Sequence, residues 1–427
     1  MAKIVKKNNV MTPFAGIFFI NEEFNRIGLG KLIDKHLGTR VSSFGYSYSE
    51  IIRSWFNIFF CGGDCAEDIQ IHLRDTLKNM PNNKVPSADT LLRGIKELAT
   101  ANTKITSSNG KEYDFNINKS LNSLNIKSLL LTQQLKSGEK YDLDYDNQII
   151  EHEKYDAKRT YKHNTGYFPG VATIGDKIVY VENRDGNANV KLSQEKTLER
   201  VYNLLKEHGI LVNRSRMDAG SYSKEIINAA AQNSELFYIR ANKCEAMTEK
   251  IREISDWKTV EINYKEYQVA SMPFTNFFED RNYRLVVMRE KGTDNQLDLF
   301  TGDNFIYRCI LTNDHEQSEK EIIEYYNGRG SSEKTFDIQN NDFGWKHLPC
   351  SDMNYNTVYL IITAMMKNFY NYIISKVSKV FKDIPIGTRL KRFIFRFISV
   401  SGRWVKQSRQ WKIQLYTEKP YEKLKFT

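Results

Sequence analysis

Cysteine is scarce in this sequence of 427 residues, which has five, at Cys61, Cys65, Cys244, Cys309 and Cys350. An odd number of widely spaced cysteines does not form a disulfide framework and suits a reducing compartment. The basic N-terminal segment lacks the apolar run of a signal peptide, and the later apolar runs carry charges within a transmembrane length. We therefore expect a cytoplasmic protein that spans no membrane.

Histidine is also sparse, and the seven histidines form no metal-binding motif. Cys61 and Cys65 suggest a metal pair, but no second Cys or His pair follows at the spacing of a zinc site. His152 and His163 flank a basic loop and are interpreted as DNA-facing or structural. The sequence also lacks a P-loop, a nucleophilic triad and an internal repeat, which argues against those classes of protein.

Positive charge exceeds negative charge, with 62 Lys and Arg against 52 acidic residues and a pI near 9.0. From Lys376 to Thr427, fourteen basic residues stand against three acidic ones, so the tail accounts for the whole excess. Such a balance favours a polyanionic partner, whether DNA, RNA or acidic lipid. Within the tail we expect Arg389, Arg392 and Arg396 to follow DNA phosphates while the neighbouring aromatic residues pack inward.

The length predicts two to four domains. Apolar residues have helical spacing from about residue 17 to residue 100, which predicts an all-α region that either reads DNA as a helix-turn-helix or only packs. The polar stretch Ala101 to Glu112 is interpreted as a loop between this region and the next.

Period-two alternation begins after Lys140 in YDLDYDNQII, GVATIG and KIVYVENR, with a tight turn at Gly175 and Asp176. A helix, a strand, a helix and a strand follow. This βββαβαβ order is typical of an RNase H-like fold. Residues 242–317 alternate again and are interpreted as a mostly β insertion, after which helices return.

The predicted fold class is α/β, an RNase H-like catalytic core interrupted by a mostly β insertion, with an all-α N-terminal region and a basic C-terminal tail. The predicted domains are a helical DNA-binding region (1–137), the first part of the core (138–241), the insertion (242–317), the second part of the core (318–375) and the basic region (376–427).

Four aspartates are candidates for chemistry. Asp142, Asp144 and Asp146 fall on one face of a predicted strand, which a solvated edge strand tolerates and a central strand tolerates only beside a cation or basic partner. Asp218 follows the strand ILVNRSRM, so we expect it at the carboxyl end of a buried strand, where open α/β sheets bind ligands. The alternative for Asp218 is a helix cap.

Glu333 is the candidate from the helical part. If its segment is helical, Tyr326, Arg329 and Glu333 share one stripe. The two glycines between Tyr326 and Ser331 each oppose a continuous helix by about 1 kcal/mol. They predict a break or bend before Ser331, and an ordinary solvated helix face is the alternative for Glu333.

Two strand aspartates and a helix glutamate suit phosphoryl transfer on DNA. This reaction uses two divalent ions about 3.5 to 4 Å apart, one at the attacking oxygen and one at the leaving oxygen. Carboxylates supply hard oxygen ligands for Mg²⁺ and leave positions open for phosphate and water. We expect two Mg²⁺ ions, with Mn²⁺ as a substitute.

These motifs resemble those of the DDE transposases of bacterial insertion sequences, within the insertion sequence 4-like group and closest in character to the insertion sequence 1380 family. LDYDNQIIE resembles the first motif, with Asp146 as metal ligand and Asp144 in reserve. RDGN, at Arg184 to Asn187, resembles the turn after the third strand, and RMDAGSYS the second motif, with Asp218 as ligand.

The third motif resembles the Y-(2)-R-(3)-E-(6)-K signature, with Tyr326, Arg329 and Glu333 in their places. Asn340 stands where the signature has lysine, and asparagine can bind a phosphate or base but brings no charge. Lys334 is one candidate to replace that charge, and Lys346 is another.

The resemblance covers nearly the whole chain and implies further contacts. Tyr326 and Arg329 would contact DNA phosphates near the cleaved end, and the insertion would help to hold a hairpin or flipped base. Trp257 lies in the insertion, where a tryptophan more often belongs to the core than to a stacking site.

The resemblance implies a transposase that cuts the ends of an insertion sequence and joins them to target DNA. Its partners would be double-stranded DNA, as terminal inverted repeats and target, and a second copy of the chain in a homodimer. Its place would be the nucleoid of a bacterial cytoplasm. The alternatives are an RNase H-like nuclease without transposition and a catalytically impaired DNA-binding descendant.

Overall fold

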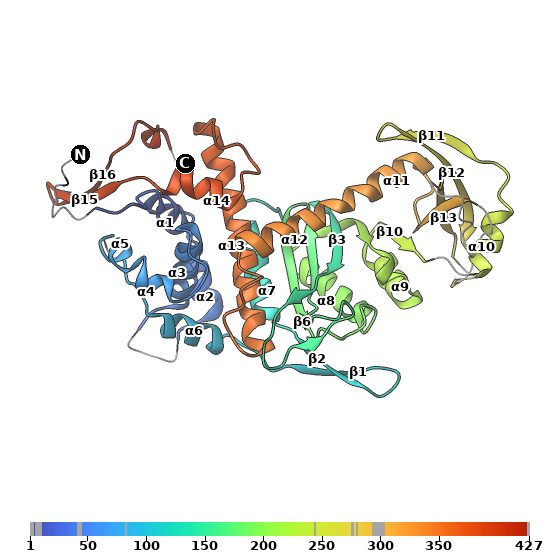
Figure 1. The fold of residues 1–427 in the computed structure, drawn as a ribbon, viewed down its shortest axis with the longest axis horizontal. Helices are drawn as coiled ribbons and strands as arrows, with labels where there is room; N and C mark the ends of the chain where they lie inside the picture. Colours follow the sequence, from blue (N-terminus) through green and yellow to red (C-terminus); the bar gives the residue numbers. More distant parts are fainter. Residues whose placement is uncertain are drawn as a thin grey trace.

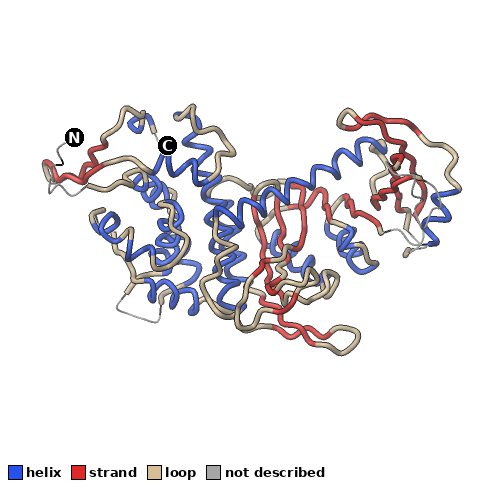
Figure 2. The backbone as a smooth tube through the Cα atoms, in the orientation of Figure 1, coloured by secondary structure: helices blue, strands red, loops and turns tan. Residues whose placement is uncertain are grey.

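A computed structural model of the chain describes residues 4, 11–40, 45–81, 83–242, 245–274, 277–278, 281–292 and 304–424. Cys244 lies outside these residues. Figure 1 shows an elongated molecule, with the N-terminal helices and the C-terminal segment at one end, a sheet flanked by helices in the middle and strands β11 to β13 at the other end. The fold is mixed α/β, as the separate helical and strand regions of Figure 2 show.

A mixed sheet of eleven described strands runs through the molecule in the order β1-β2-β8-β7-β3-β9-β10-β14-β13-β12-β11. Its strands are β1 (Thr103–Thr106), β2 (Glu112–Asn116), β3 (Lys140–Asn147), β7 (Gly170–Ile174), β8 (Lys177–Arg184), β9 (Leu211–Met217), β10 (Leu236–Ala241), β11 (Lys258–Ile262), β12 (Lys265–Phe274), β13 (Tyr283–Lys291) and β14 (Phe305–Thr312). β3 lies inside this sheet, antiparallel to β7 and parallel to β9.

The predicted order of strands and helices after Lys140 is confirmed. β3, β7 and β8 pair antiparallel in succession, with Gly175 at a φ of 60° in the tight turn. β9 and β10 then add in parallel on the other side of β3, each after a helix, α8 (Gln194–Glu207) or α9 (Lys224–Asn233). The short strands β4 (Ile150–Glu151), β5 (Lys158–Arg159) and β6 (Thr165–Tyr167) form a separate small sheet in the connection from β3 to β7.

Helices cover both faces of the central strands. On one face, α8 and α9 bury Leu198 and Ile226 in the same apolar cluster as Leu143 of β3. On the other face lie α7 (Lys119–Leu131) and α13 (Met353–Val380), and α13 shares a second cluster with Ile178 of β8. Most of the side chains of α13 are buried. None of the helices in the described ranges is long and apolar enough to cross a membrane.

The N-terminal region is helical, as predicted, and packs against the C-terminal segment. Its helices are α1 (Ile17–Arg26), α2 (Leu29–Leu37), α3 (Tyr48–Phe60), α4 (Asp68–Ile71), α5 (Arg74–Lys78) and α6 (Ala88–Glu97). The C-terminal elements are α14 (Leu390–Phe393), a π-helix (Ile394–Ile398), β15 (Gly402–Gln407), β16 (Gln410–Leu415) and a short turn (Tyr421–Lys423). Both ends contribute to the apolar cluster that contains α13, so their cores are shared.

The interpretation of Ala101 to Glu112 as a loop is wrong, because β1 and β2 form a hairpin there. The turn from Ser107 to Lys111 contains Gly110 at a φ of 80°. The hairpin lies at the sheet edge and β1 is almost entirely exposed, so its strands lack the apolar alternation that identifies a half-buried strand. β2 joins the sheet through β8.

The region predicted as a β insertion contains β11 to β14 and the helix α10 (Glu245–Arg252). Its strands extend the central sheet, because β14 pairs antiparallel with β10. The next helix, α11 (Glu319–Asn327), crosses from this region towards β3 (Figure 1). A tighter turn at Gly328–Gly330 then separates α11 from α12 (Ser331–Asp342), so the predicted change in the helix before Ser331 is present.

Candidate active site

Three aspartates on one face of β3 each have an arginine partner. The pairs are Asp142 with Arg214 at 2.6 Å, Asp144 with Arg216 at 2.6 Å and Asp146 with Arg329 at 2.8 Å. Three carboxylates on an internal strand repel one another unless positive charge offsets them. The arginines of β9 and of the turn after α11 supply that charge.

Asp146 is the aspartate at the carboxyl end of β3. Burial raises the pKa of Asp146 to about 6, the guanidinium of Arg329 opposes this shift, and the negative charge of Asp218 adds to it. The side chain is 17% exposed. Its Oδ1 accepts a hydrogen bond from the Asn147 backbone and its Oδ2 accepts one from Arg329. Two carboxylates close enough to perturb each other in a partly buried place are suited to hold a divalent cation.

Asp218 lies beside Asp146 because of the register of two parallel strands. Tyr145 of β3 pairs with Met217 of β9, so the next residues, Asp146 and Asp218, follow at the same level of the two neighbouring chains. Asp218 begins the short helical turn Ala219–Ser221, and its carboxylate accepts only a long contact of 3.5 Å from the hydroxyl of Ser221 among the described hydrogen bonds. Asp218 therefore lies at the carboxyl end of an internal strand of the sheet, although most side chains of β9 are only partly buried.

A cavity of about 520 Å³ opens in front of these two aspartates. Its wall includes Asp146, Asn147, Tyr161, Asn187, Asn189 and Asp218. The segment with Asn187 and Asn189 follows β8, where the sequence analysis placed a turn. The cavity is large enough for cations together with a phosphate group and water, and its wall offers amide groups that can donate hydrogen bonds.

Tyr326 and Arg329 approach the site from the end of α11. The hydroxyl of Tyr326 donates to the carbonyl of Met217 at 3.2 Å, next to Asp218. Arg329 lies in the turn after α11 and reaches Asp146. The structure therefore brings together four residues of the three motifs, namely Asp146, Asp218, Tyr326 and Arg329.

Glu333 lies on the first turn of α12, four residues after Arg329, with an exposed side chain. Within the described part of the chain, the ligand atoms of Asp146, Asp218 and Glu333 do not all lie within 4.8 Å of one another. The tighter turn Gly328–Gly330 lies between the α-helix that contains Tyr326 and the helix that contains Glu333. The role of Glu333 as a ligand stays a prediction.

The other predicted DNA-binding residues lie away from the two aspartates. Asn340 borders a separate cavity between α3, α12 and α14, and Lys334 borders a third one beside α13. Arg389 forms ion pairs with Asp337 and Asp342 of α12, each at 2.7 Å.

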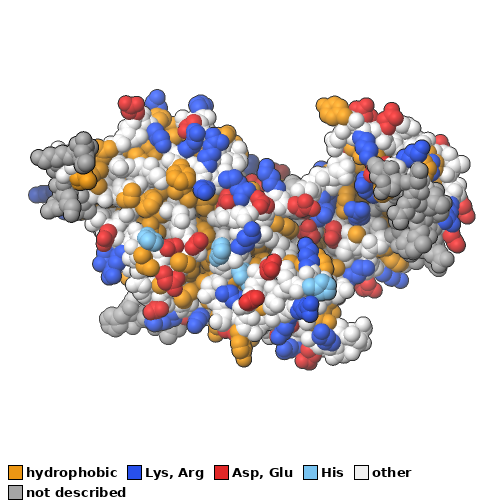
Figure 3. Space-filling model, viewed as in Figure 1, with side chains coloured by type: hydrophobic (Ala, Val, Ile, Leu, Met, Phe, Trp, Pro, Cys, Tyr) orange, Lys and Arg blue, Asp and Glu red, His pale blue; other side chains and the backbone are white. Residues whose placement is uncertain are grey.

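Two further arginines of the C-terminal segment differ in their surroundings. Arg396 pairs with Asp383 at 2.8 Å, whereas Arg392 is exposed. The face in Figure 3 shows Lys and Arg side chains mixed with acidic ones along the whole molecule, so positive charge is not confined to this segment. The DNA contacts of these residues stay predictions.

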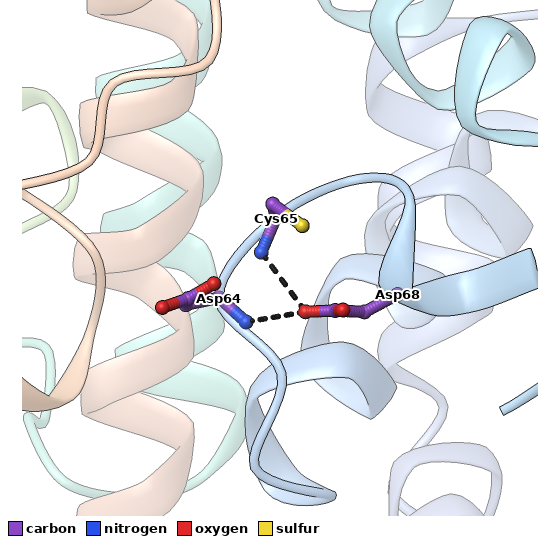
Figure 4. Close-up of side chains that lie close together, drawn as sticks. All are labelled: Asp64, Cys65 and Asp68. Carbon is purple, nitrogen blue, oxygen red and sulfur yellow. Dashed lines mark hydrogen bonds between the residues drawn. The ribbon is translucent and has the colours of Figure 1, made fainter. Parts of the chain in front are cut away.

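A second group of possible metal ligands lies at the end of α3, where Figure 4 shows Asp64, Cys65 and Asp68 close together. The Oδ2 atom of Asp68 accepts hydrogen bonds from the backbone of Asp64 at 2.9 Å and of Cys65 at 3.2 Å. This carboxylate therefore closes the turn before α4. Cys61 is buried while Cys65 is exposed.

Arg214 and Arg216 are site residues that the sequence alone does not identify. Both alternate along ILVNRSRMD with the same period of two as the aspartates of YDLDYD. Complementary charges at matching spacing on two strands predict ion pairs only if the strands are known to be neighbours, and that pairing is not local in sequence.

Residues 6–426 match the family model described as Transposase DDE domain group 1. The chain belongs to this DDE transposase family. It is a metal-dependent DNA-cleaving enzyme, and members of the family generally use divalent metal ions. The prediction of a DDE transposase is thereby confirmed.

A solved structure similar to this transposase is a piggyBac transposase synaptic complex with hairpin DNA. The two share 13% identity with a TM-score of 0.43, over 90% of this chain and 79% of that one. No curated protein sequence matches the chain.

Proposed function

We propose that this transposase belongs to the insertion sequence 4-like group, in the insertion sequence 1380 family, and that Asp146, Asp218 and Glu333 are its metal ligands. It cuts DNA at the ends of an insertion sequence and joins the 3′ ends to target DNA. The observation that carries this proposal is the convergence of Asp146 and Asp218 at the ends of adjacent parallel strands, with Arg329 beside them.

An RNase H-like core is supported by the connectivity around β3. Three antiparallel strands come first, and β9 and β10 then add in parallel on the other side of β3, each after a helix. We keep the core as residues 138–241 and 318–375, the insertion as 242–317, and the flanking regions as 1–137 and 376–427.

The chemistry of the carboxylates fits divalent metal ions. Asp146 and Asp218 share one cavity, and Asp218 keeps its oxygens nearly free of hydrogen bonds within the described structure. Asp144 is a weaker candidate than Asp146, because both its oxygens accept hydrogen bonds from Arg216 and its side chain is 3% exposed. Bound Mg²⁺ or Mn²⁺ would lower the pKa of a coordinated water or 3′ hydroxyl and stabilise negative charge on the phosphate.

The chain's own residues then have distinct tasks. Asp146, Asp218 and Glu333 hold the ions, Arg329 and Tyr326 bind DNA phosphates beside them, and Asn187 and Asn189 hydrogen-bond the strand in the cavity. Asn340, Lys334, Arg389, Arg392 and Arg396 hold DNA further from the reaction. The protein acts as a homodimer on paired ends within a bacterial nucleoid.

The test uses purified protein and a labelled DNA fragment that carries the inverted repeats flanking the gene, with Mg²⁺ or Mn²⁺. We expect metal-dependent cleavage at the repeat ends and joined products when target plasmid is added. Asp146→Asn, Asp218→Asn and Glu333→Gln each lose cleavage by about a thousandfold or more, because each removes a ligand while DNA binding remains.

Two matched variants serve as controls. Asp142→Asn changes an aspartate on the same strand face whose partner is Arg214, and Glu324→Gln changes an exposed glutamate of α11. Both should cleave normally. Cleavage that persists in Asp146→Asn would rule out the proposed ligand set, and cleavage without joined products would indicate a nuclease.

A further inference from the structure

Arg216 contacts two separate elements at once. Its Nε and Nη2 atoms donate to the two oxygens of Asp144 on β3, at 2.6 and 2.8 Å. Its Nη1 atom donates to the backbone carbonyl of Tyr325 at 2.6 Å, in the last turn of α11. One guanidinium therefore joins the strand that carries Asp146 to the helix end that carries Arg329.

The contacts of Arg216 fix the orientation of its guanidinium group. The guanidinium carbon lies 4.6 Å from the centre of the Tyr325 ring, and the side chain of Arg216 is 11% exposed. A planar group that binds a carboxylate with two nitrogens and a carbonyl with the third has a single orientation. Because the carbonyl belongs to Tyr325, the last turn of α11 can neither slide nor rotate over β9 without breaking it.

The turn after α11 is fitted to the same side chain. A methyl group added at Gly328 would lie 2.9 Å from the Nη1 atom of Arg216. At Gly330, on the other side of Arg329, an added methyl group would meet no described atom within 4 Å. Gly328 thus leaves space for Arg216, which explains one of the two glycines that interrupt the helix.

We propose that Arg216 is a positioning residue: it fixes the end of α11 to β3 and so sets where Arg329 and Glu333 stand relative to Asp146. Arg216 touches neither DNA nor metal in this role. The inference rests on the proposed function and deepens it, because it names the residue that aligns Arg329 and Glu333 with Asp146.

The test measures Mn²⁺ binding to the complex of the protein with uncleavable flanking-repeat DNA, by the electron paramagnetic resonance signal of the free ion. Arg216→Lys keeps the charge but cannot span Asp144 and Tyr325. We expect it to weaken Mn²⁺ binding by about tenfold or more, the usual effect of changing a residue that orients a ligand. DNA affinity should stay within about twofold.

Arg214→Lys is the matched control, because Arg214 lies on the same strand, pairs with Asp142 and covers the same Tyr325 ring at 3.9 Å. Its described hydrogen bonds do not include the Tyr325 carbonyl. Gly328→Ala should reproduce the effect of Arg216→Lys without altering any charge, and Gly330→Ala should not. Thermal unfolding of all four variants checks that each is folded.

Each outcome supports or overturns the proposal. Weakened Mn²⁺ binding in Arg216→Lys and Gly328→Ala, with binding retained in the two controls, supports it. Equal binding in Arg216→Lys and Arg214→Lys overturns the positioning role while wild-type cleavage still upholds the function. If the wild-type complex binds no Mn²⁺ and the wild type cleaves no DNA, the proposed function fails, and the positioning role fails with it.

Discussion

The Nη1 atom of Arg329 lies 2.8 Å from the Oδ2 atom of Asp146, so a proposed phosphate-binding residue is hydrogen-bonded to a proposed metal ligand. A guanidinium and a divalent cation compete for the same carboxylate. We expect a DNA phosphate to draw Arg329 away and so to free Asp146 for the ion, which would couple DNA binding to metal binding.

Removal of this competitor should tighten metal binding by the DNA-free protein. A hydrogen bond between charged groups contributes about 1.5 kcal/mol or more, and each 1.4 kcal/mol is about tenfold in affinity. We expect Arg329→Gln to bind Mn²⁺ roughly tenfold more tightly without DNA, measured by the signal of the free ion. Its DNA affinity should fall.

The neighbouring pair provides the comparison for this experiment. Arg214→Gln removes the partner of Asp142, which is not a proposed ligand, and should leave Mn²⁺ affinity unchanged. Weaker Mn²⁺ binding in Arg329→Gln would show that Arg329 supports the metal site and does not compete for it.

Glu319 ties the start of α11 to the strands of the insertion. Its Oε1 atom accepts hydrogen bonds from Ser271 of β12 and Arg284 of β13, both at 2.8 Å. Burial opposes ionisation of this carboxyl, but these hydrogen bonds and the charge of Arg284 outweigh burial and lower the pKa of Glu319 to about 2. The insertion therefore holds one end of α11 while Arg216 holds the other.

This lowered pKa predicts acid sensitivity. A carboxyl that is more acidic in the folded protein stabilises it above about pH 4.5, and this contribution, about 3 kcal/mol, is lost as the pH falls towards 2. Urea unfolding at pH 7, 5 and 3 should show Glu319→Gln less stable than wild type at pH 7, with the difference shrinking at pH 3. Glu324→Gln, on the same helix but exposed, should show no such change.

Asn368 of α13 fastens that helix to β8. Its amide nitrogen donates to the carbonyl of Ile178 at 2.8 Å and to the side chain of Asn125 at 3.0 Å, and its oxygen accepts from the Ile178 backbone at 3.1 Å. Asn368→Leu removes the partner of the Ile178 N–H and of the Asn125 side-chain oxygen, each at about 1 to 3 kcal/mol, whereas the Ile178 carbonyl keeps a hydrogen bond from Asn125. We expect a loss of several kcal/mol in urea unfolding.

Asn371 offers the control for that substitution. It lies on the same helix, three residues further on, and is only half-buried, with hydrogen bonds to Asp176 at the surface. Asn371→Leu should cost less than about 1 kcal/mol, because water can replace these hydrogen bonds. Similar losses in both variants would mean that the buried amide network adds little to stability.

The sequence predicts the parts of the site that local patterns encode. Alternation identifies β3 and β9, and the polar residues at their ends point to Asp146 and Asp218. The partners of the aspartates are not predictable in this way, because the Asp144 to Arg216 contact depends on two strands separated by α8 and the strands β7 and β8. The sequence also does not predict that β14 extends the sheet, because β14 pairs with β10, which lies far from it in the chain.

Local sequence patterns also do not predict the exposed β1–β2 hairpin or the core that the two ends of the chain share. The β1–β2 hairpin is exposed at the sheet edge, so it has the composition of a loop. The sequence predicts that aromatic residues of the basic C-terminal segment pack inward, and Phe393 and Phe397 are buried, but it does not predict that they lie in the cluster of the N-terminal helices. An amphipathic pattern indicates that a face is covered and does not indicate by which part of the chain.

Gly16, at the start of α1, provides the sharpest test of that shared core. A methyl group added there would lie 2.2 Å from the carbonyl oxygen of Phe397 and 2.6 Å from the Cα atom of Ile398, so the backbone of the C-terminal segment would have to move. Overpacking of this kind typically costs about 1 to 3 kcal/mol. Gly16→Ala should lower stability by that amount in urea unfolding and expose the C-terminal segment to limited proteolysis.

Gly30→Ala in α2, where the nearest atom is 3.4 Å away, should instead leave stability equal or slightly higher, since alanine favours the helix. If Gly16→Ala is as stable and as protease-resistant as Gly30→Ala, the close contact between the two ends of the chain does not exist in solution.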